Sequence, residues 1–281
     1  MSWSFYLPYR VGQLHFMTIA NMTISGYFGA YAALNWNWPF LLVFFMGIAL
    51  SGLIGFLVSL AIGDAPCFAV VIVGFTFIYI TKTIVENVEA LGGTLGMFGI
   101  PKLAEDPNTS RLLIFITAYL LVIIVGIFIY RFEHSRLGRA ASAIFVDQDL
   151  GTSFGVNVKR LGIGLQTAAS AIGGASGVLY AYIMRNLFPD FFTFHLVGVC
   201  MTMLFVGGYS TMWGVVLAAP ALWGIPLLFP PAIQSWRIVI YGVLLLVVLV
   251  LKPEGIISRR FVYKVENFLK PKRRKELIKT N

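Results

Sequence analysis

Long apolar stretches separated by short polar connections run along this chain. Six uninterrupted stretches are each near the roughly 20 residues that a helix needs to cross a bilayer. These stretches are residues 11–34, 40–62, 67–85, 112–130, 161–183 and 233–251. A seventh apolar stretch, residues 196–229, is interrupted by Gly207 and Gly208. The pattern predicts an all-α protein, a polytopic membrane helix bundle with about six full spans plus a re-entrant or broken helical hairpin.

The composition excludes an ordinary soluble domain. Hydrophobic residues make up 58% of the chain and charged residues 12%, whereas about a quarter of the residues of an average soluble domain are charged. Helices that are apolar on all sides are membrane spans or the core of a much larger protein. We therefore expect residues 1–251 to form a transmembrane domain and residues 252–281 to form a basic cytoplasmic tail.

Residues with catalytic or metal-binding chemistry are sparse. The two cysteines, Cys67 and Cys200, both lie in apolar stretches, and the three histidines are spread over 180 residues without carboxylates at metal-ligand spacing. The chain has no G-x-x-x-x-G-K-[ST] phosphate-binding loop. We expect no catalytic residue, no metal, no cofactor and no nucleic-acid partner, and we expect the chain not to be an enzyme.

The charges predict an orientation in the membrane. Residues 131–160 carry five Lys and Arg against three acids, and residues 252–281 carry ten against three. Positively charged connections face the cytoplasm, so we place both segments there. Residues 86–111, with four acids and two bases, then lie outside.

The chain must cross the membrane an even number of times between the two cytoplasmic segments. Two uninterrupted stretches, 161–183 and 233–251, already lie between them, so residues 196–229 cannot be a single further crossing. Their 34 residues would form about 51 Å of helix at ~1.5 Å per residue, too short for two full passes across a ~30 Å core. We therefore predict a re-entrant hairpin that is broken at Gly207 and Gly208. Broken membrane helices are typical of a transport path, and we place Asn21, Gly92, Gly93, Gly207 and Gly208 on it. Glycines that serve packing alone remain the alternative.

Two glycine segments share the pattern G-G-x-x-x-M-[FW]-G, namely GGTLGMFG at 92–99 and GGYSTMWG at 207–214. A chance match and a common origin both stay open. Because the first segment lies in an external connection and the second in an apolar stretch, we expect the first to shape a turn or vestibule wall. We expect the second to open a membrane helix.

The connection at 131–160 is too hydrophilic to enter the membrane and too long for a simple turn. Its small residues, acidic pair and glycines predict a short helix, an acidic turn and a second break. A solvated connector is the alternative. A calcium loop starting at Asp147 is excluded, because glycine at its sixth and glutamate at its twelfth position are missing.

This connection closely resembles the cytoplasmic loop of the inner-membrane permeases of branched-chain amino-acid ABC transporters, in particular the second, M-type, of their two permease types. The matching pattern is a serine, G-R-A, A-I, an acidic pair and G-[IV]-N-V. The resemblance continues through SAIGGASGVLYAYI (170–183), FVGGYSTMWGVVLAAPAL (205–222) and LKPEGI (251–256), and also covers VGQL (11–14) and GYFGAYAA (26–33).

The resemblance implies a multi-pass permease of the bacterial or archaeal plasma (inner) membrane that carries branched-chain amino acids. Its implied partners are a second related permease, two cytoplasmic ATP-binding-cassette ATPase subunits and an extracytoplasmic substrate-binding protein, besides membrane lipid. It also implies an ATPase-coupling loop. The residues implied for this loop are Gly138, Arg139, Ala140, Ala143, Asp147, Asp149 and Gly155.

Some positions depart from the family pattern. Phe145 stands where the family carries an arginine, and Ile72 and Phe77 stand where the third span often has Thr and Glu. Urea, short amides or other small polar solutes are therefore the alternative substrates within the family. An ion-coupled secondary transporter is a further alternative, but it ordinarily places ionisable residues inside its spans, and here Lys82 and Arg237 sit near span ends.

Overall fold

The computed structural model describes residues 1–153, 155–224, 236–252 and 255–257, and at 148–150, 237 and 238 it describes the backbone alone. The chain divides into two compact units, residues 1–200 and 201–281. The predicted tail, 252–281, and the end of the predicted hairpin, 225–229, lie largely or wholly outside the described residues.

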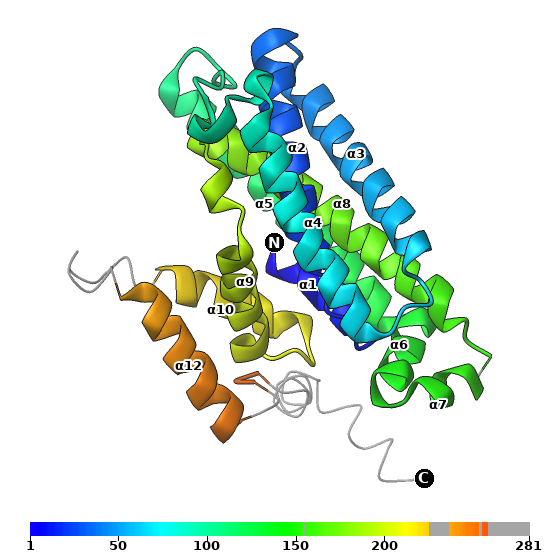
Figure 1. Cartoon of the computed structure of the whole chain (residues 1–281). Helices are drawn as coiled ribbons and strands as arrows, with labels where there is room; N and C mark the ends of the chain where they lie inside the picture. The colour runs from blue at the N-terminus through cyan, green and yellow to red at the C-terminus, as the bar shows by residue number, and fades with distance from the viewer. Residues whose placement is uncertain (154, 225–235, 253–254, 258–281) are drawn as a thin grey trace, which may run out of the picture. The chain divides into compact units, whose positions relative to one another are not determined.

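Unit 1 is built of helices joined by short connections (Figure 1). In chain order these helices are α1 (Ser2–Tyr9), α2 (Met17–Asn35), α3 (Phe40–Ala61), α4 (Cys67–Asn87), α5 (Pro107–His134), α6 (Arg136–Val146), α7 (Gln148–Ser153), α8 (Val158–Met184) and the first half of α9 (Phe194–Gly207). Three single 3₁₀ turns, η1 (Glu89–Leu91), η2 (Gly93–Leu95) and η3 (Pro189–Phe191), lie in the connections. Two short strands, β1 (Met97–Phe98) and β2 (Asn186–Leu187), pair antiparallel.

Unit 2 contains the end of α9, then α10 (Met212–Gly224) and α12 (Arg237–Leu251). Both α10 and α12 are apolar but shorter than a full span over their described residues. The predicted span at 233–251 is thus described only from Trp236 onward.

Five helical segments of the described chain are long and apolar enough to cross a membrane. They are α3, α4, α5, α8 and Pro189–Gly207, which consists of η3, its connection and α9. The side chains of α5 are the least buried of these, since only 11% of its most apolar window is covered by protein, as expected for a helix that faces lipid. The prediction of an all-α, polytopic membrane helix bundle is confirmed.

The predicted span at 11–34 is only partly right. Residues 11–16 are not helical, and α2 begins at Met17. Gly12 has a φ of +74°, a conformation that ends a regular helix and that glycine adopts without strain. The short helix α1, which precedes this turn, was not predicted. Helix α2 is less apolar than the five segments above, because it carries polar residues that face protein rather than lipid.

Helices α2, α3 and α8 pack closely through small residues. On α3, four small residues spaced four apart are all buried: Gly47, Ser51, Gly55 and Ser59. On α8, a side chain at Gly177 would lie 2.1 Å from the carbonyl oxygen of Met22 on α2. Small residues on one helix face let two backbones approach, and this contact is a main source of helix association in membranes. The three-helix contact is therefore the core of unit 1.

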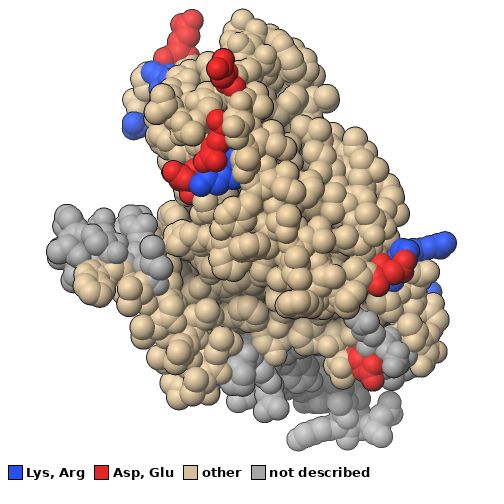
Figure 2. Space-filling model, viewed as in Figure 1, with Lys and Arg blue, Asp and Glu red and all other residues tan. Residues whose placement is uncertain are grey.

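Charged side chains gather toward the two ends of unit 1, with a broad uncharged band between them on the face that Figure 2 shows. One end carries Asp64 and Lys159, whose side chains form an ion pair. The other end carries Lys82, Glu86 and Asp190. Because charged groups are costly inside a bilayer, this distribution fits a protein whose two ends lie in water.

Candidate functional site

The predicted coupling connection forms α6 and α7 at one end of unit 1 (Figure 1). Helix α6 starts at a serine cap, since the Ser135 hydroxyl accepts a hydrogen bond from Gly138 N over 3.2 Å. Helix α8 starts in the same way, with Asn157 Oδ1 accepting from Arg160 N over 2.9 Å. These two caps fix where the membrane helices α5 and α8 give way to the connection.

Helix α6 has an inner and an outer face. Gly138, Ala141 and Ile144 are buried at a spacing of three, so this face packs on the rest of unit 1. A side chain at Gly138 would lie 2.2 Å from the carbonyl oxygen of Phe132, which makes this glycine a requirement of the α5–α6 turn. Gly138 is therefore buried in this turn, and its part in coupling stays a prediction.

The other predicted coupling residues lie on or near the outer face. Arg139 is exposed, and Ala140 and Ala143 are half-buried. Asp147 ends α6 and is exposed, while Gly155 is exposed with a φ of +72°. Asp149 lies where the backbone alone is described. That these residues contact an ATPase stays a prediction.

The other end of unit 1 is closed by a small structure that we call the β1–β2 cap, residues 88–106 and 185–193. Besides the strand pair, Arg185 Nε donates to the carbonyl oxygen of Ile100 over 3.0 Å. Gly92 and Gly93 both have positive φ angles; Gly92 lies between η1 and η2, and Gly93 is the first residue of η2. The first G-G-x-x-x-M-[FW]-G segment thus forms turns, as its position in the sequence indicates.

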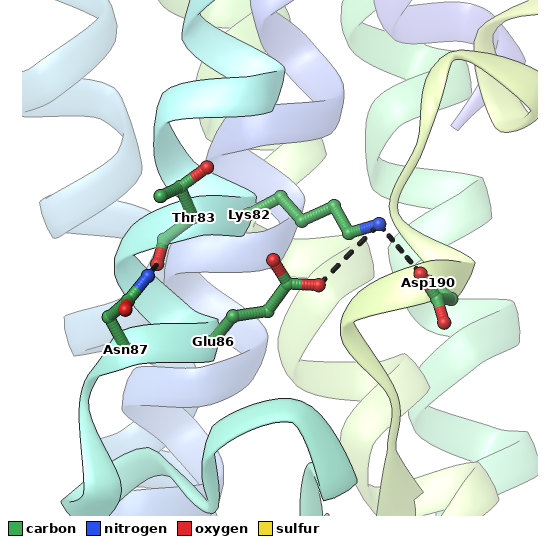
Figure 3. A network of polar contacts seen from close by, with 5 residues as sticks. All are labelled: Lys82, Thr83, Glu86, Asn87 and Asp190. Carbon is green, nitrogen blue, oxygen red and sulfur yellow. Dashed lines mark hydrogen bonds and ion pairs between the residues drawn. The ribbon is translucent and has the colours of Figure 1, made fainter.

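An ion-pair network ties helix α4 to the β1–β2 cap (Figure 3). Lys82 Nζ lies 2.6 Å from Asp190 Oδ1 in η3 and 3.5 Å from Glu86 Oε1 one turn along α4. The lysine side chain is 22% exposed and that of Asp190 is 85% exposed. Lys82 therefore extends its ammonium group from the span end toward water.

The second glycine segment forms the break between α9 and α10 in unit 2. Helix α9 ends at Gly207 and α10 begins at Met212, and Gly208 has a φ of +118°. A side chain at Gly207 would lie 2.3 Å from the carbonyl oxygen of Gly214. The first and last glycines of the segment therefore let the two helix ends meet. The helix break lies where the sequence predicts it, and its re-entrant course in the membrane stays a prediction.

Residues 255–257 contact the end of α9. Ile256 N and Ile257 N donate to the carbonyl oxygens of Val206 and Gly207 over 2.9 and 3.0 Å. The last carbonyl groups of a helix lack partners within the helix, and these two bonds provide them. Ile256 of the LKPEGI motif and Val206 at the end of α9, which are 50 positions apart in the chain, are thus bonded to each other within unit 2.

Asn21 is fully buried in α2, and within the described chain neither atom of its side-chain amide has a hydrogen-bond partner. The Ser51 hydroxyl of α3 donates to the backbone carbonyl oxygen of Asn21 over 3.1 Å. Beside it, His15 Nε2 and Ser170 Oγ are 3.2 Å apart. We call this group, with Gln13 and Gln166, the α2–α3–α8 polar cluster.

Only Asn21 of the α2–α3–α8 polar cluster was predicted from the sequence, and the other residues of the cluster were missed. Gln166 Nε2 donates to Gln13 Oε1 over 2.7 Å, while Gln166 Oε1 and the buried Ser59 hydroxyl have no partner among the described residues. Buried polar groups are nearly always hydrogen-bonded, and polar residues inside membrane bundles mark functional positions. The sequence signal that could have indicated this cluster is the four-residue spacing of serines and glycines on α3, at positions 47–59.

The described residues contain no group of three or more His, Cys, Asp or Glu side chains that could hold a metal ion. Cys67 and Cys200 are free thiols. Cys67 Sγ lies 3.1 Å from the carbonyl oxygen of Gly12, next to the end of α1. The chemistry that the described part of the chain offers is therefore hydrogen bonding from neutral groups in the bundle and charge at its ends.

The pattern of a family described as "Branched-chain amino acid transport system / permease component" matches residues 1–249. The chain is 25% identical over 237 residues to the high-affinity branched-chain amino acid transport system permease protein LivM of Escherichia coli (strain K12), covering 75% of this chain and 55% of the relative.

A second relative is the probable branched-chain amino acid transport permease protein LivM of Methanocaldococcus jannaschii. Identity is 26% over 243 residues, which cover 78% of this chain and 69% of the relative. The LivM protein of Salmonella typhimurium is 24% identical over 277 residues, covering 85% of this chain and 64% of the relative. The chain thus spans between about half and two thirds of the length of these relatives. No solved structure matches the chain.

Proposed function

The chain belongs to the family of permease components of branched-chain amino acid transport systems, and on this premise we propose that it is the permease subunit of an ATP-binding-cassette importer. It forms part of the translocation path for branched-chain amino acids across the plasma membrane. The observation that carries the proposal is α6, a helix outside the membrane bundle with a packed inner face and an outer face of small residues around Ala143.

The outer face of α6 suits docking on another protein. Ala140 and Ala143 leave the surface flat, and Leu137 and Val146 expose apolar side chains beside them, at 57% and 78%. An exposed apolar patch with a polar rim is typical of an interaction site. The ATPase subunits of the importer are the partner that we assign to this face, because the chain has no nucleotide-binding loop of its own.

The orientation follows from charge. The α6 end of unit 1 carries the basic connection, so it faces the cytoplasm, and the β1–β2 cap with its acidic excess faces outward. A substrate-binding protein then delivers solute to the cap side. A second related permease completes the membrane part. Membrane lipid is the partner proposed for the basic tail, 252–281.

The path for the solute runs past neutral polar groups. Asn21 supports this proposal, because its amide is buried and lacks a partner within the described chain, and a passing amino group or carboxylate would supply one. The break at Gly207 and Gly208 adds backbone groups of the kind that line transport paths. A permease for urea, short amides or other small polar solutes remains the alternative, since these groups suit any small polar molecule.

Transport by the reconstituted importer tests the proposal. The chain is co-purified with candidate ATPase, second permease and binding-protein subunits, and the complex is placed in liposomes that contain ATP. Radiolabelled leucine, isoleucine and valine should accumulate, and an ATPase variant without hydrolysis should abolish uptake. Uptake of urea or acetamide but not of leucine would select the alternative substrates. Uptake driven by a proton or sodium gradient without ATP would refute an ATP-driven importer.

A further inference from the structure

The short helix α1 contacts the helix that we propose to dock on the ATPase. The ring of Tyr9 lies 5.4 Å, between centroids, from the ring of Phe145 on α6. Arg10 Nη2 donates to the Ser142 hydroxyl on α6 over 2.6 Å. The Tyr6 hydroxyl donates to Glu133, three residues before α6 begins. Helix α1 and the following residue Arg10 therefore contact both α6 and the last turn of α5.

Helix α1, which makes these contacts, is itself buried. Phe5, Tyr6 and Leu7 are each exposed by 1% or less, so α1 is packed inside unit 1. Arg10 is only 6% exposed, and its guanidinium carbon lies 5.9 Å from the centroid of the Tyr6 ring. A buried charge is costly without partners. Here the Tyr6 ring and the Ser142 hydroxyl of α6 are partners of the guanidinium group, whereas its Nε has no hydrogen-bond partner among the described residues.

The chain after α1 leads directly to the polar cluster. Gly12 makes the turn with its φ of +74°, and residues 11–16 then run along α8. On this path Gln13 bonds to Gln166 and His15 lies beside Ser170. Residues 9–15 thus contact α6 at one end and the neighbourhood of Asn21 at the other.

Phe145 is the position at which this chain departs from the arginine of the family pattern. In the structure its ring packs on Tyr9, and aromatic pairs in such tilted arrangements attract each other beyond the effect of their buried area. At position 145, where the family pattern has a charged arginine, this chain therefore holds α6 by an aromatic contact. The two residues that make this contact are Tyr9 and Phe145.

We infer that α1 is a brace that fixes the position of α6 against the bundle, with Tyr9 and Arg10 as its positioning residues. The brace is a property of unit 1 alone. Its consequence for transport, namely that α6 moves the polar cluster through residues 9–15 when the ATPase acts, rests on the proposed function. The two parts are tested by separate measurements.

The first measurement is electron paramagnetic resonance on the full chain in detergent. Both cysteines are replaced by alanine, and a nitroxide is attached at Val146→Cys, an exposed position on α6. Tyr9→Ala and Arg10→Ala should each make the label more mobile. Tyr9→Phe, which keeps the ring, and Arg111→Ala, an exposed arginine at the start of α5, should leave the spectrum unchanged. An unchanged spectrum in both Tyr9→Ala and Arg10→Ala would overturn the brace.

The second measurement uses the assembled importer. Tyr9→Ala and Arg10→Ala should retain the ATPase subunits but reduce substrate-stimulated ATP hydrolysis by about fivefold or more, the lower range of coupling between distant sites. Tyr9→Phe should restore it. Full stimulation in both variants, or joint loss of ATPase binding and stimulation, would overturn the transmission role. If the unmodified chain binds no ATPase, the proposed function fails. The spin-label spectra still test whether α1 fixes the position of α6.

Discussion

The ammonium group of Lys82 on α4 lies 2.6 Å from the carboxylate of Asp190 in η3. These residues are 108 positions apart in the chain, and their ion pair joins a membrane helix to the cap beside it. Exposed ion pairs contribute little, typically below about 1 kcal/mol, because water and salt screen them. The cap is therefore held mainly by its backbone contacts, with the ion pair as a small addition.

The first prediction concerns this ion pair. Asp190→Asn should lower the free energy of unfolding by less than about 1 kcal/mol, and the loss should shrink in high salt. Thermal unfolding in detergent at low and high salt measures it. Glu105→Gln, a change of an exposed acid in the same cap without an ion pair among the described residues, is the control. A loss of several kcal/mol that is insensitive to salt would contradict this account.

The second prediction concerns the start of α5. Hydrogen bonds from the Thr109 hydroxyl and backbone N–H lower the pKa of Asp106 below its usual value. A lowered pKa means that the ionised cap stabilises the folded helix end above the unfolded pKa, and that this stabilisation is lost as pH falls through the folded pKa. Hydrogen-exchange protection of the first turn of α5 should therefore fall in acid.

Asp106→Ala should remove both the protection and its pH dependence. Asp106→Asn should keep the protection, because asparagine caps helices about as well as aspartate, but it should lose the pH dependence. Protection that responds to pH in the Asp106→Asn chain would assign the effect to another group.

The third prediction concerns the small-residue contact of α2 and α8. A side chain at Gly177 would meet backbone and the Ser25 hydroxyl at 2.1–2.3 Å, whereas Gly164, on the same helix, has nothing within 4 Å of that position. Gly177→Ala should therefore destabilise the chain by about 1–3 kcal/mol, and Gly164→Ala should be neutral or stabilising. Unfolding in detergent compares the two. Equal stability of both variants would refute close packing at Gly177.

The sequence predicted the apolar helices well because hydropathy over about 20 residues reports directly on membrane burial. Helices α3, α4, α5 and α8 all fall within a few residues of the predicted stretches. The predicted start of α2 was wrong because residues 11–16, at the start of the predicted stretch, form turns and irregular backbone rather than helix. Hydropathy does not report backbone conformation. Helix α1 is short, and eight residues carry no periodic signal of their own.

The candidate site was less predictable because its residues meet only in three dimensions. Ser51 and Ser170, which flank Asn21, lie on different helices, and no local pattern pairs them. Phe145 appeared as a departure that weakens a match, whereas its ring has a partner in Tyr9. Gly138 is among the residues implied for coupling, yet it is buried at the α5–α6 turn. Only the fold shows which side of a surface helix faces outward.

The last prediction concerns Ala143 on the outer face of α6. Because closely packed surfaces tolerate little added volume, Ala143→Arg should prevent the ATPase subunits from docking. The bundle itself should stay folded, since exposed substitutions usually change stability by no more than about 0.5 kcal/mol and Ala143 is half-buried outside the membrane helices. Uptake and ATPase co-purification should both fall sharply. Ala104→Arg, at a half-buried alanine in the β1–β2 cap, adds the same side chain at the other end of unit 1 and should leave ATPase binding intact. Normal uptake and normal ATPase recovery in the Ala143→Arg chain would show that α6 is a solvated connector, and the docking face would then have to lie elsewhere.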